Sequence, residues 1–122
     1  MTRDVLARGC LSRSAYEDLA GKWAGLAVLA LGEGAQRFSE LRRRVDGVSE
    51  KMLSQTLQAL ERDGLVHREV VTAIPPRVVY SLTPLGHRLR SPLRAFADLL
   101  EETAGEIGKA RENFDAVRGA RS

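Results

Sequence analysis

Arginine, lysine and amide side chains gather in one stretch of this chain, residues 36–66. Arginine donates paired hydrogen bonds to phosphate, glutamine offers a donor and an acceptor that suit adenine, and lysine or arginine donates to guanine. We therefore expect the stretch to hold a DNA backbone and to read base edges. The candidate residues are Arg37, Ser39, Arg42, Arg43, Ser49, Lys51, Ser54, Gln55, Gln58 and Arg62, together with Arg77 further along the chain.

These candidates divide by role. The arginines that precede Gly47 are expected to grip phosphates, and the polar residues from Lys51 to Gln58 are expected to face the bases. Glu61 and Asp63 make the far end of this segment less suited to DNA, and Arg44 is expected to pair with a nearby acid. The alternative for each candidate is a solvated surface side chain.

Cys10 is the other chemically reactive candidate. It lies between Arg8 and Arg13, shortly before an expected helix start, and both surroundings favour the thiolate that oxidants and electrophiles attack. As the one cysteine of the chain, it can form sulfenic acid, a mixed disulfide or a disulfide with a partner chain. Redox sensing is one interpretation, and a small idle residue is the other.

Catalysis has little support in the sequence. His67 and His87 fall in separate elements without a nucleophile or the spacing of metal ligands, and no glycine-rich phosphate loop is present. We expect neither an enzyme nor a metal or cofactor site.

Length and charge define the setting of these residues. The 122 residues suit one domain, and 16 of the 19 basic residues are arginine. Residues 1–97 carry a net charge of +5 (15 basic, 10 acidic), and residues 98–122 carry −2 (4 basic, 6 acidic). No apolar run reaches the roughly 20 residues that span a bilayer, and the first residues lack the pattern of a secretion signal. A cytoplasmic protein is expected, without membrane contact.

Hydrophobic spacing predicts four helices before residue 65. A capping box at Ser14–Glu17 predicts a first helix from Ser14 to Gly21, and Trp23 is expected in the core at the start of a second helix ending at 32–34. A third helix is predicted over 39–45, followed by a turn at 46–47. A fourth runs from an N-cap at Ser49 to Gly64, with Leu53, Thr56, Leu57 and Leu60 on its buried face.

Two strands should follow, at 65–71 and 78–82, joined by a loop over 72–77 that contains consecutive prolines. A β-hairpin after two packed helices is a wing, and Arg77 would lie at its base. The predicted fold is mainly α with a small β-hairpin wing: a winged helix-turn-helix with terminal dimerisation helices.

A long helix should begin at Thr83–Pro84 and be kinked by Pro92. Its apolar residues recur about every 3.5 positions, and we expect the stripe to meet the same stripe on a second copy. Packing onto the chain's own first helix is the alternative. The division predicted is an arm over 1–13, a DNA-binding core over 14–83 and a dimerisation helix and tail over 84–122. The expected interface residues are Leu93, Phe96, Leu100 and Ile107.

Several blocks, in order, resemble the HxlR-type transcriptional regulators: Cys10, Gly21–Trp23, Arg37–Arg42, Ser49–Leu53, Leu60–Val66 and Pro75–Thr83. The resemblance covers roughly residues 10–100. It implies a homodimer that binds a palindromic operator, with terminal helices forming the dimer. Some members sense oxidants, quinones or aldehydes through an N-terminal cysteine, which Cys10 matches by its spacing to Trp23. Leu11 and Ala20 depart from the proline and glycine usual in that family.

Three functional hypotheses remain open. The first is a dimeric regulator that acts as a repressor and responds to oxidants or electrophiles through Cys10. The second is a regulator of the same fold controlled by a non-covalent small molecule, and the third is a winged helix serving protein–protein assembly. The operator, the regulated genes, the sign of regulation and the effector are not predicted, because they vary widely across such proteins.

Overall fold

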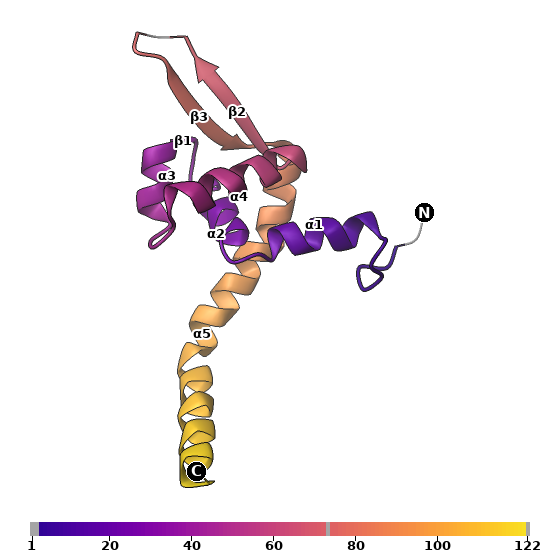
Figure 1. The fold of residues 1–122 in the computed structure, drawn as a ribbon, viewed down its shortest axis with the longest axis vertical. Coiled ribbons are helices and arrows are strands. Elements are labelled where there is room, and N and C mark those ends of the chain that lie inside the picture. Colours follow the sequence, from indigo (N-terminus) through magenta and orange to yellow (C-terminus); the bar gives the residue numbers. More distant parts are fainter. Residues whose placement is uncertain (1–2, 73, 122) are drawn as a thin grey trace. The chain divides into compact units, whose positions relative to one another are not determined.

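A computed structural model of the chain describes residues 3–72 and 74–121 (Figure 1). Parts of the predicted arm, wing loop and tail (residues 1–2, 73 and 122) lie outside them. The chain divides into two compact units, residues 1–91 and 92–122. The elements are α1 (Leu11–Leu19), α2 (Ala24–Leu31), β1 (Gln36–Arg37), α3 (Phe38–Arg44), α4 (Glu50–Arg62), β2 (Val66–Val71), β3 (Arg77–Leu82) and α5 (Pro84–Arg121).

The core of the first unit lies where α2 packs against α3 and α4. The small residues of α2 allow close approach, and its Val28 is fully buried. Leu41 of α3 and Leu53 and Leu60 of α4 are also fully buried. Burial of each of these leucines stabilises the packing of α2, α3 and α4 by about 1.5–3 kcal/mol. The apolar spacing of the sequence correctly predicted this face of α4.

Two glycines and a serine fix the ends of α4. Gly47 has a φ of +89° in the turn after α3, and Gly64 has a φ of +78° just beyond the C-terminal end of α4. Both values lie in the left-handed region that glycine adopts without steric cost. Ser49 is the N-cap, and its Oγ accepts a hydrogen bond from the backbone N–H of Met52 at 3.1 Å. The predicted turn, cap and stop are confirmed.

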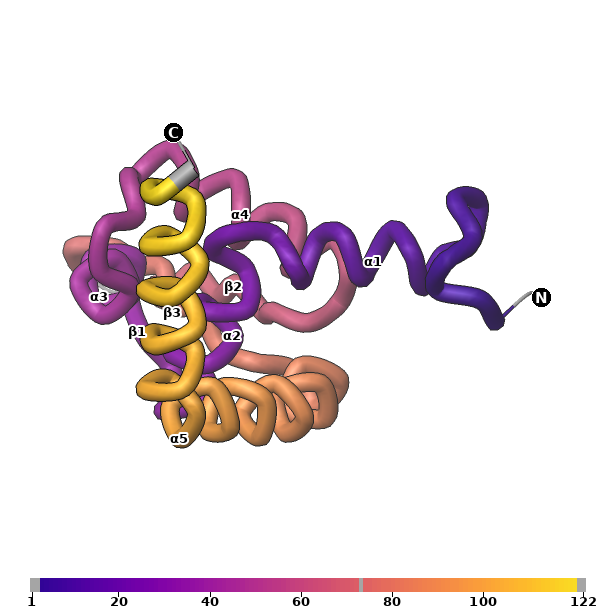
Figure 2. The backbone as a smooth tube through the Cα atoms, turned by 90° about the horizontal axis from the view of Figure 1, so that it is seen from below, coloured from indigo at the N-terminus to yellow at the C-terminus, as the bar shows by residue number. Residues whose placement is uncertain are grey.

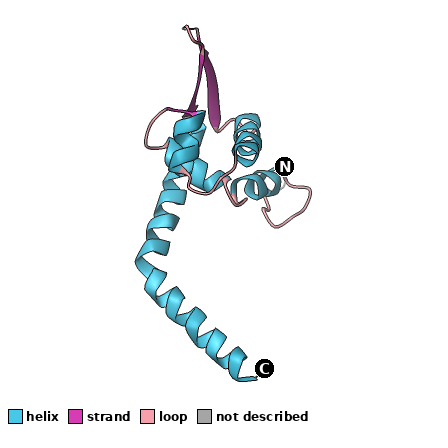
Figure 3. Cartoon of the chain, turned by 60° about the vertical axis from the view of Figure 1, so that its left-hand side comes forward, coloured by secondary structure: helices cyan, strands magenta, loops and turns pink. Residues whose placement is uncertain are grey.

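The sheet has three antiparallel strands in the order β1–β3–β2, and β2 and β3 form the wing (Figure 3). Strand β1 was not predicted, because a two-residue strand carries no alternating pattern. It pairs Gln36 with Tyr80 and Arg37 with Val79. The strand therefore joins the segment before α3 to the wing.

The prediction for the start of α1 was wrong. The helix begins at Leu11, because Cys10 has the extended backbone of an N-cap and its carbonyl accepts from Arg13 N at 3.0 Å. Ser14 is therefore inside the helix, and the helix ends at Leu19, before Gly21. No residue of α1 is buried, and its C-terminal end meets the rest of the first unit (Figure 2).

Trp23 is also not part of the buried core. It is half-buried at the N-cap of α2, because α2 fills the interior with small and aliphatic side chains and leaves the indole at the edge.

Thr83 ties the start of α5 to the end of α4. Its hydroxyl donates to the carbonyl of Gly64 at 2.6 Å and accepts from the N–H of Gly86 at 3.0 Å, and its own N–H donates to Leu65 O at 3.0 Å. The predicted cap at Thr83–Pro84 is thus confirmed. Helix α5 continues through Pro92 to Arg121.

In the second unit, α5 combines ion pairs with exposed apolar side chains. Arg94 contacts Asp98 at 2.8 Å and Glu101 at 3.3 Å. None of the helices in residues 3–72 and 74–121 is long and apolar enough to cross a membrane.

Candidate nucleic-acid interface

Helix α4 presents a continuous polar face on the side opposite its buried leucines. This outward face consists of Lys51, Gln55, Gln58 and Arg62, all exposed, with the half-buried Ser54 beside them. The i, i+4, i+7 and i+11 spacing places the four residues within one stripe of a helix. The structure therefore brings together the residues that the sequence predicted to read bases.

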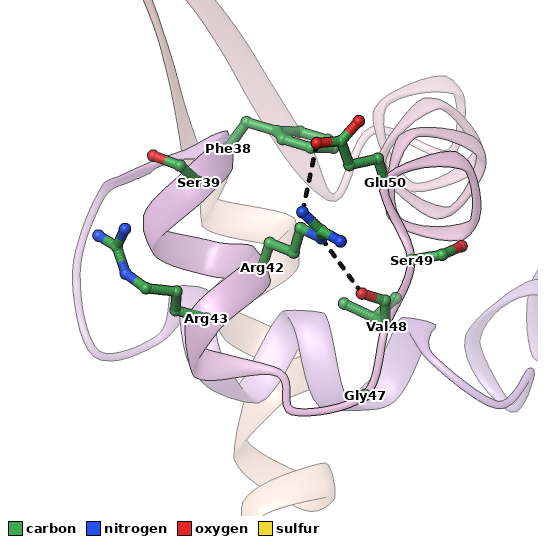
Figure 4. A pocket seen from close by; sticks show the side chains of 8 residues that line it. All are labelled: Phe38, Ser39, Arg42, Arg43, Gly47, Val48, Ser49 and Glu50. Atoms are coloured by element: carbon green, nitrogen blue, oxygen red, sulfur yellow. Dashed lines mark hydrogen bonds and ion pairs between the residues drawn. The ribbon is translucent and has the colours of Figure 1, made fainter.

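A wide, open depression of about 580 Å³ lies at the N-terminal end of α4, between α4 and α3 (Figure 4). Its walls include Ser39, Arg42 and Arg43 from α3 and Ser49 from the cap of α4. Arginine and hydroxyl side chains beside a helix N-terminus form a favourable setting for an anion, because backbone N–H groups and the helix dipole add to the positive charge.

Arg42 and Arg43 differ in what they contact within this depression. Arg42 forms an ion pair with Glu50 at 3.2 Å and donates to the carbonyl of Val48 at 3.4 Å, whereas Arg43 extends to the other side of α3 (Figure 4). Both partners of the Arg42–Glu50 pair are largely exposed, so the pair is weak and Arg42 can exchange it for a phosphate at little cost.

Two other arginines of the stretch have structural contacts. Both side-chain nitrogens that Arg44 uses lie 2.8 Å from the carboxylate oxygens of Glu33, and this pairing raises the pKa of Arg44. The expected partner acid is thus Glu33. Arg37 donates its backbone N–H to Glu40 at 3.0 Å at the start of α3, and its side chain is exposed.

The wing lies along one side of α4 and contributes residues to the candidate interface that were not predicted from the sequence. A depression of about 340 Å³ lies between α4 and the wing, and it is lined by Ser54, Gln58 and Glu61 together with Arg68 and Tyr80. Arg68 pairs with Tyr80 across the sheet. The sequence held a signal: Arg68 follows the buried Val66 by two residues, and alternate strand residues share a face.

Arg77 lies at the other end of the wing. It pairs with Val71 beside the hairpin loop, so it lies at the tip end of the wing. The prediction that it lies at the base was therefore wrong. Because both strands are six residues long, the base of the wing is the Val66–Leu82 pair, next to the C-terminal end of α4 and the N-terminal end of α5.

Cys10 occupies the N-cap position of α1 without a capping hydrogen bond from its side chain, and its surroundings differ from those expected. Its Sγ lies 3.0 Å from the hydroxyl of Ser12, and this hydrogen bond, followed by contacts with backbone groups of Asp4, Ser12 and Arg13, lowers the pKa of the thiol. The guanidinium of Arg13 is instead paired with Glu17 at 2.6 Å. Local hydrogen bonds thus favour the thiolate, whereas the prediction from the sequence rested on the flanking arginines and the nearby helix start.

The predicted dimer residues lie along α5 in the second unit. Phe96 is 60% exposed, Leu100 is 42% exposed and Ile107 is 37% exposed, whereas Leu93 is half-buried. Leu99, Phe114 and Val117 extend the exposed apolar surface. Among the described residues, no group of three or more histidine, cysteine, aspartate or glutamate side chains is placed to hold a metal ion.

Comparison with known proteins places this geometry among DNA-binding regulators. The model of the HxlR-like helix-turn-helix family matches residues 18–107. An uncharacterised HTH-type transcriptional regulator, YtfH of Escherichia coli K12, is 44% identical over 109 residues, which are 89% of this chain and 86% of the relative.

Solved structures agree with this match. The structure of a transcriptional regulator described as ytfH from Salmonella typhimurium superimposes with a TM-score of 0.83 at 43% identity, covering 89% of this chain and 97% of the other. The reduced form of a redox regulator named HypR superimposes with a TM-score of 0.74 at 32% identity, covering 82% and 99% of the two chains.

Proposed function

The chain belongs to the HxlR-like helix-turn-helix family, and from this premise we propose that it is a homodimeric transcriptional repressor that binds a palindromic operator. It is a winged helix-turn-helix regulator and not an enzyme. The observation that carries the proposal is the outward face of α4, an exposed polar stripe that continues into an arginine-lined depression at the end where such helices read bases.

Lys51, Ser54, Gln55 and Gln58 are the proposed base-reading residues. They lie in the N-terminal half of α4, and Ser54 is short enough to let the helix approach the base edges closely. Arg62 is at the last position of α4, where it suits a phosphate.

The residues proposed to contact phosphates lie around the base-reading residues of α4. Arg37, Ser39, Arg42, Arg43 and Ser49 belong to α3 and the two helix starts, and Arg77 extends from the tip end of the wing. Exposure and the weakness of the Arg42–Glu50 pair support their availability.

A second copy of the chain is the proposed partner of α5. Phe96, Leu99 and Leu100 form a contiguous exposed apolar surface in the second unit, and such a surface is normally covered by a partner. A two-fold dimer presents two copies of α4 and therefore requires a palindromic site.

Cys10 is the proposed sensor of oxidants or electrophiles. Its lowered pKa increases the thiolate fraction, and HypR, a structural relative, is described as a redox regulator. With a quinone, a bond would form between Sγ and a ring carbon, and the electron pair of the ring double bond would shift to a carbonyl oxygen. The attacked carbon would then lose its proton to solvent while the two oxygens take up protons, which leaves a thioether-linked hydroquinone. Control by a non-covalent ligand is the alternative.

Recovery of bound genomic fragments tests the proposal. The purified protein should enrich fragments that share an inverted repeat, with half-sites about one helical turn apart, roughly 10–10.5 base pairs. Its mass at micromolar concentration should be that of two chains. Fragments without a shared sequence, or a monomeric mass, would contradict the proposal.

A further inference from the structure

Helix α4 has a second flank, on the side away from the wing. A shallow groove of about 270 Å³ separates α4 from the turn between α1 and α2. Lys22 and Trp23 line it from the turn, and Met52, Gln55 and Ala59 line it from α4. Gln55 thus belongs to both the outward face and this groove, which we call the Lys22 groove.

The spacing along α4 places the two flanks on either side of the outward face. Met52, Gln55 and Ala59 follow the i, i+3, i+7 pattern of one helix edge, and Ser54 and Gln58 of the wing-side depression lie on the other edge. A helix with its side chains is about as wide as the DNA major groove, roughly 10–12 Å, so the two phosphate backbones must run along its two flanks.

The wing-side flank already has Arg68 to meet one backbone. On the other flank the corresponding cation is Lys22, whose Nζ lies 4.8 Å from the centre of the Trp23 ring. The indole face attracts the ammonium group and restricts its position beside Gln55. None of the residues predicted from the sequence to bind DNA lies on this flank's turn.

Two acidic residues of α1, Glu17 and Asp18, also line the Lys22 groove. Glu17 is paired with Arg13 at 2.6 Å, which offsets its charge. Asp18 lies close to Asp63, just beyond the C-terminal end of α4, and burial together with this neighbouring Asp18 raises the pKa of Asp63. Lys22 is the cation among the residues that line the groove.

We propose that the Lys22 groove is a binding site for a DNA backbone phosphate, with Lys22 as the cation that binds the strand opposite the one held by the wing. The inference rests on the proposed DNA binding, and it adds a contact between the protein and the second DNA strand. Lys22 acts without base preference, and it positions Gln55 against the base edges by fixing the helix in the groove.

Salt titration of binding tests this assignment. The unsubstituted protein, Lys22→Gln and Lys22→Arg are compared on a duplex carrying the recovered site and on an unrelated duplex of the same length. Lys109→Gln, which removes an equal charge from the second unit, is the control. Because the proposed dimer carries two copies of Lys22, loss of both phosphate contacts should lower the slope of log K against log salt by about 1.8 and weaken binding about 60-fold at 0.1 M salt.

The expected result is that Lys22→Gln shows this loss on both duplexes, while Lys22→Arg and Lys109→Gln keep the original slope. An unchanged slope for Lys22→Gln overturns the inference alone. A loss confined to the specific duplex also overturns it, because it would mean base reading. No salt-dependent binding by the unsubstituted protein would overturn the proposed function as well.

Discussion

Replacing Gly86 with alanine should destabilise the first unit sharply, although alanine is the better helix former. A Cβ at this position would lie 2.2 Å from the carbonyl oxygen of Leu65 and 3.2 Å from Cδ2 of Leu82. The backbone oxygen cannot rotate away as a flexible side chain would. The first turn of α5 must therefore move away from the end of α4.

That movement disrupts the hydrogen bonds that centre on Thr83. Overpacking costs about 1–3 kcal/mol, and each of two weakened hydrogen bonds costs about 0.5–1.5 kcal/mol. Alanine in place of glycine returns up to about 1 kcal/mol of helix propensity. The balance is a loss of about 3 kcal/mol in the free energy of unfolding.

Urea unfolding followed by far-ultraviolet circular dichroism measures this loss, at one fixed protein concentration because the stability of the proposed dimer would depend on concentration. Gly105→Ala is the matched control, since no atom lies within 4 Å of the Cβ it would add, and it should leave stability unchanged or raise it by up to about 1 kcal/mol. Equal or greater stability of Gly86→Ala would refute the reasoning from the close contact with Leu65.

Three further outcomes are expected. Gln55→Ala should weaken binding to the specific site by about 1–3 kcal/mol and relax preference at one base pair, and unchanged preference in a binding-site selection would exclude a reading role. Cys10→Ser should remain on operator DNA when diamide releases the unsubstituted protein; release of both would remove the thiol hypothesis. The raised pKa of Asp63 means that the folded state binds a proton more tightly than the unfolded chain, so stability falls as pH rises from its ordinary value of 3.8 through the raised folded value. Asp63→Asn should therefore raise Tm at neutral pH and lose that advantage in acid, and a pH-independent effect on Tm would contradict the raised pKa of Asp63.

Helix α4 was predictable because its signals are local. Ser49, Gly64 and the leucine spacing act within a few residues, and they agree with one another. The N-terminus of α1 was not, because Ser14–Glu17 satisfies the same capping pattern as a true start. Cys10 is the N-cap because its backbone is extended, and the sequence pattern does not reveal that conformation.

The flanks of the interface were missed for a different reason. Lys22 and Arg68 are separated from α4 in sequence, and each becomes part of the candidate interface only when α1, α2 and the wing pack around that helix. Trp23 was predicted in the core because of its size, whereas its position at the N-cap of α2 leaves it at the edge of the Lys22 groove.

The division of α4 into a buried leucine side and an exposed polar side has an evolutionary consequence. Leu53, Leu57 and Leu60 hold the helix in place, while Lys51, Gln55 and Gln58 are exposed and do not build the core. Surface substitutions of this kind usually change stability by less than about 0.5 kcal/mol. After gene duplication, a copy of this scaffold can therefore acquire a new set of target genes through a few changes on one side of one helix, without first passing through an unstable intermediate.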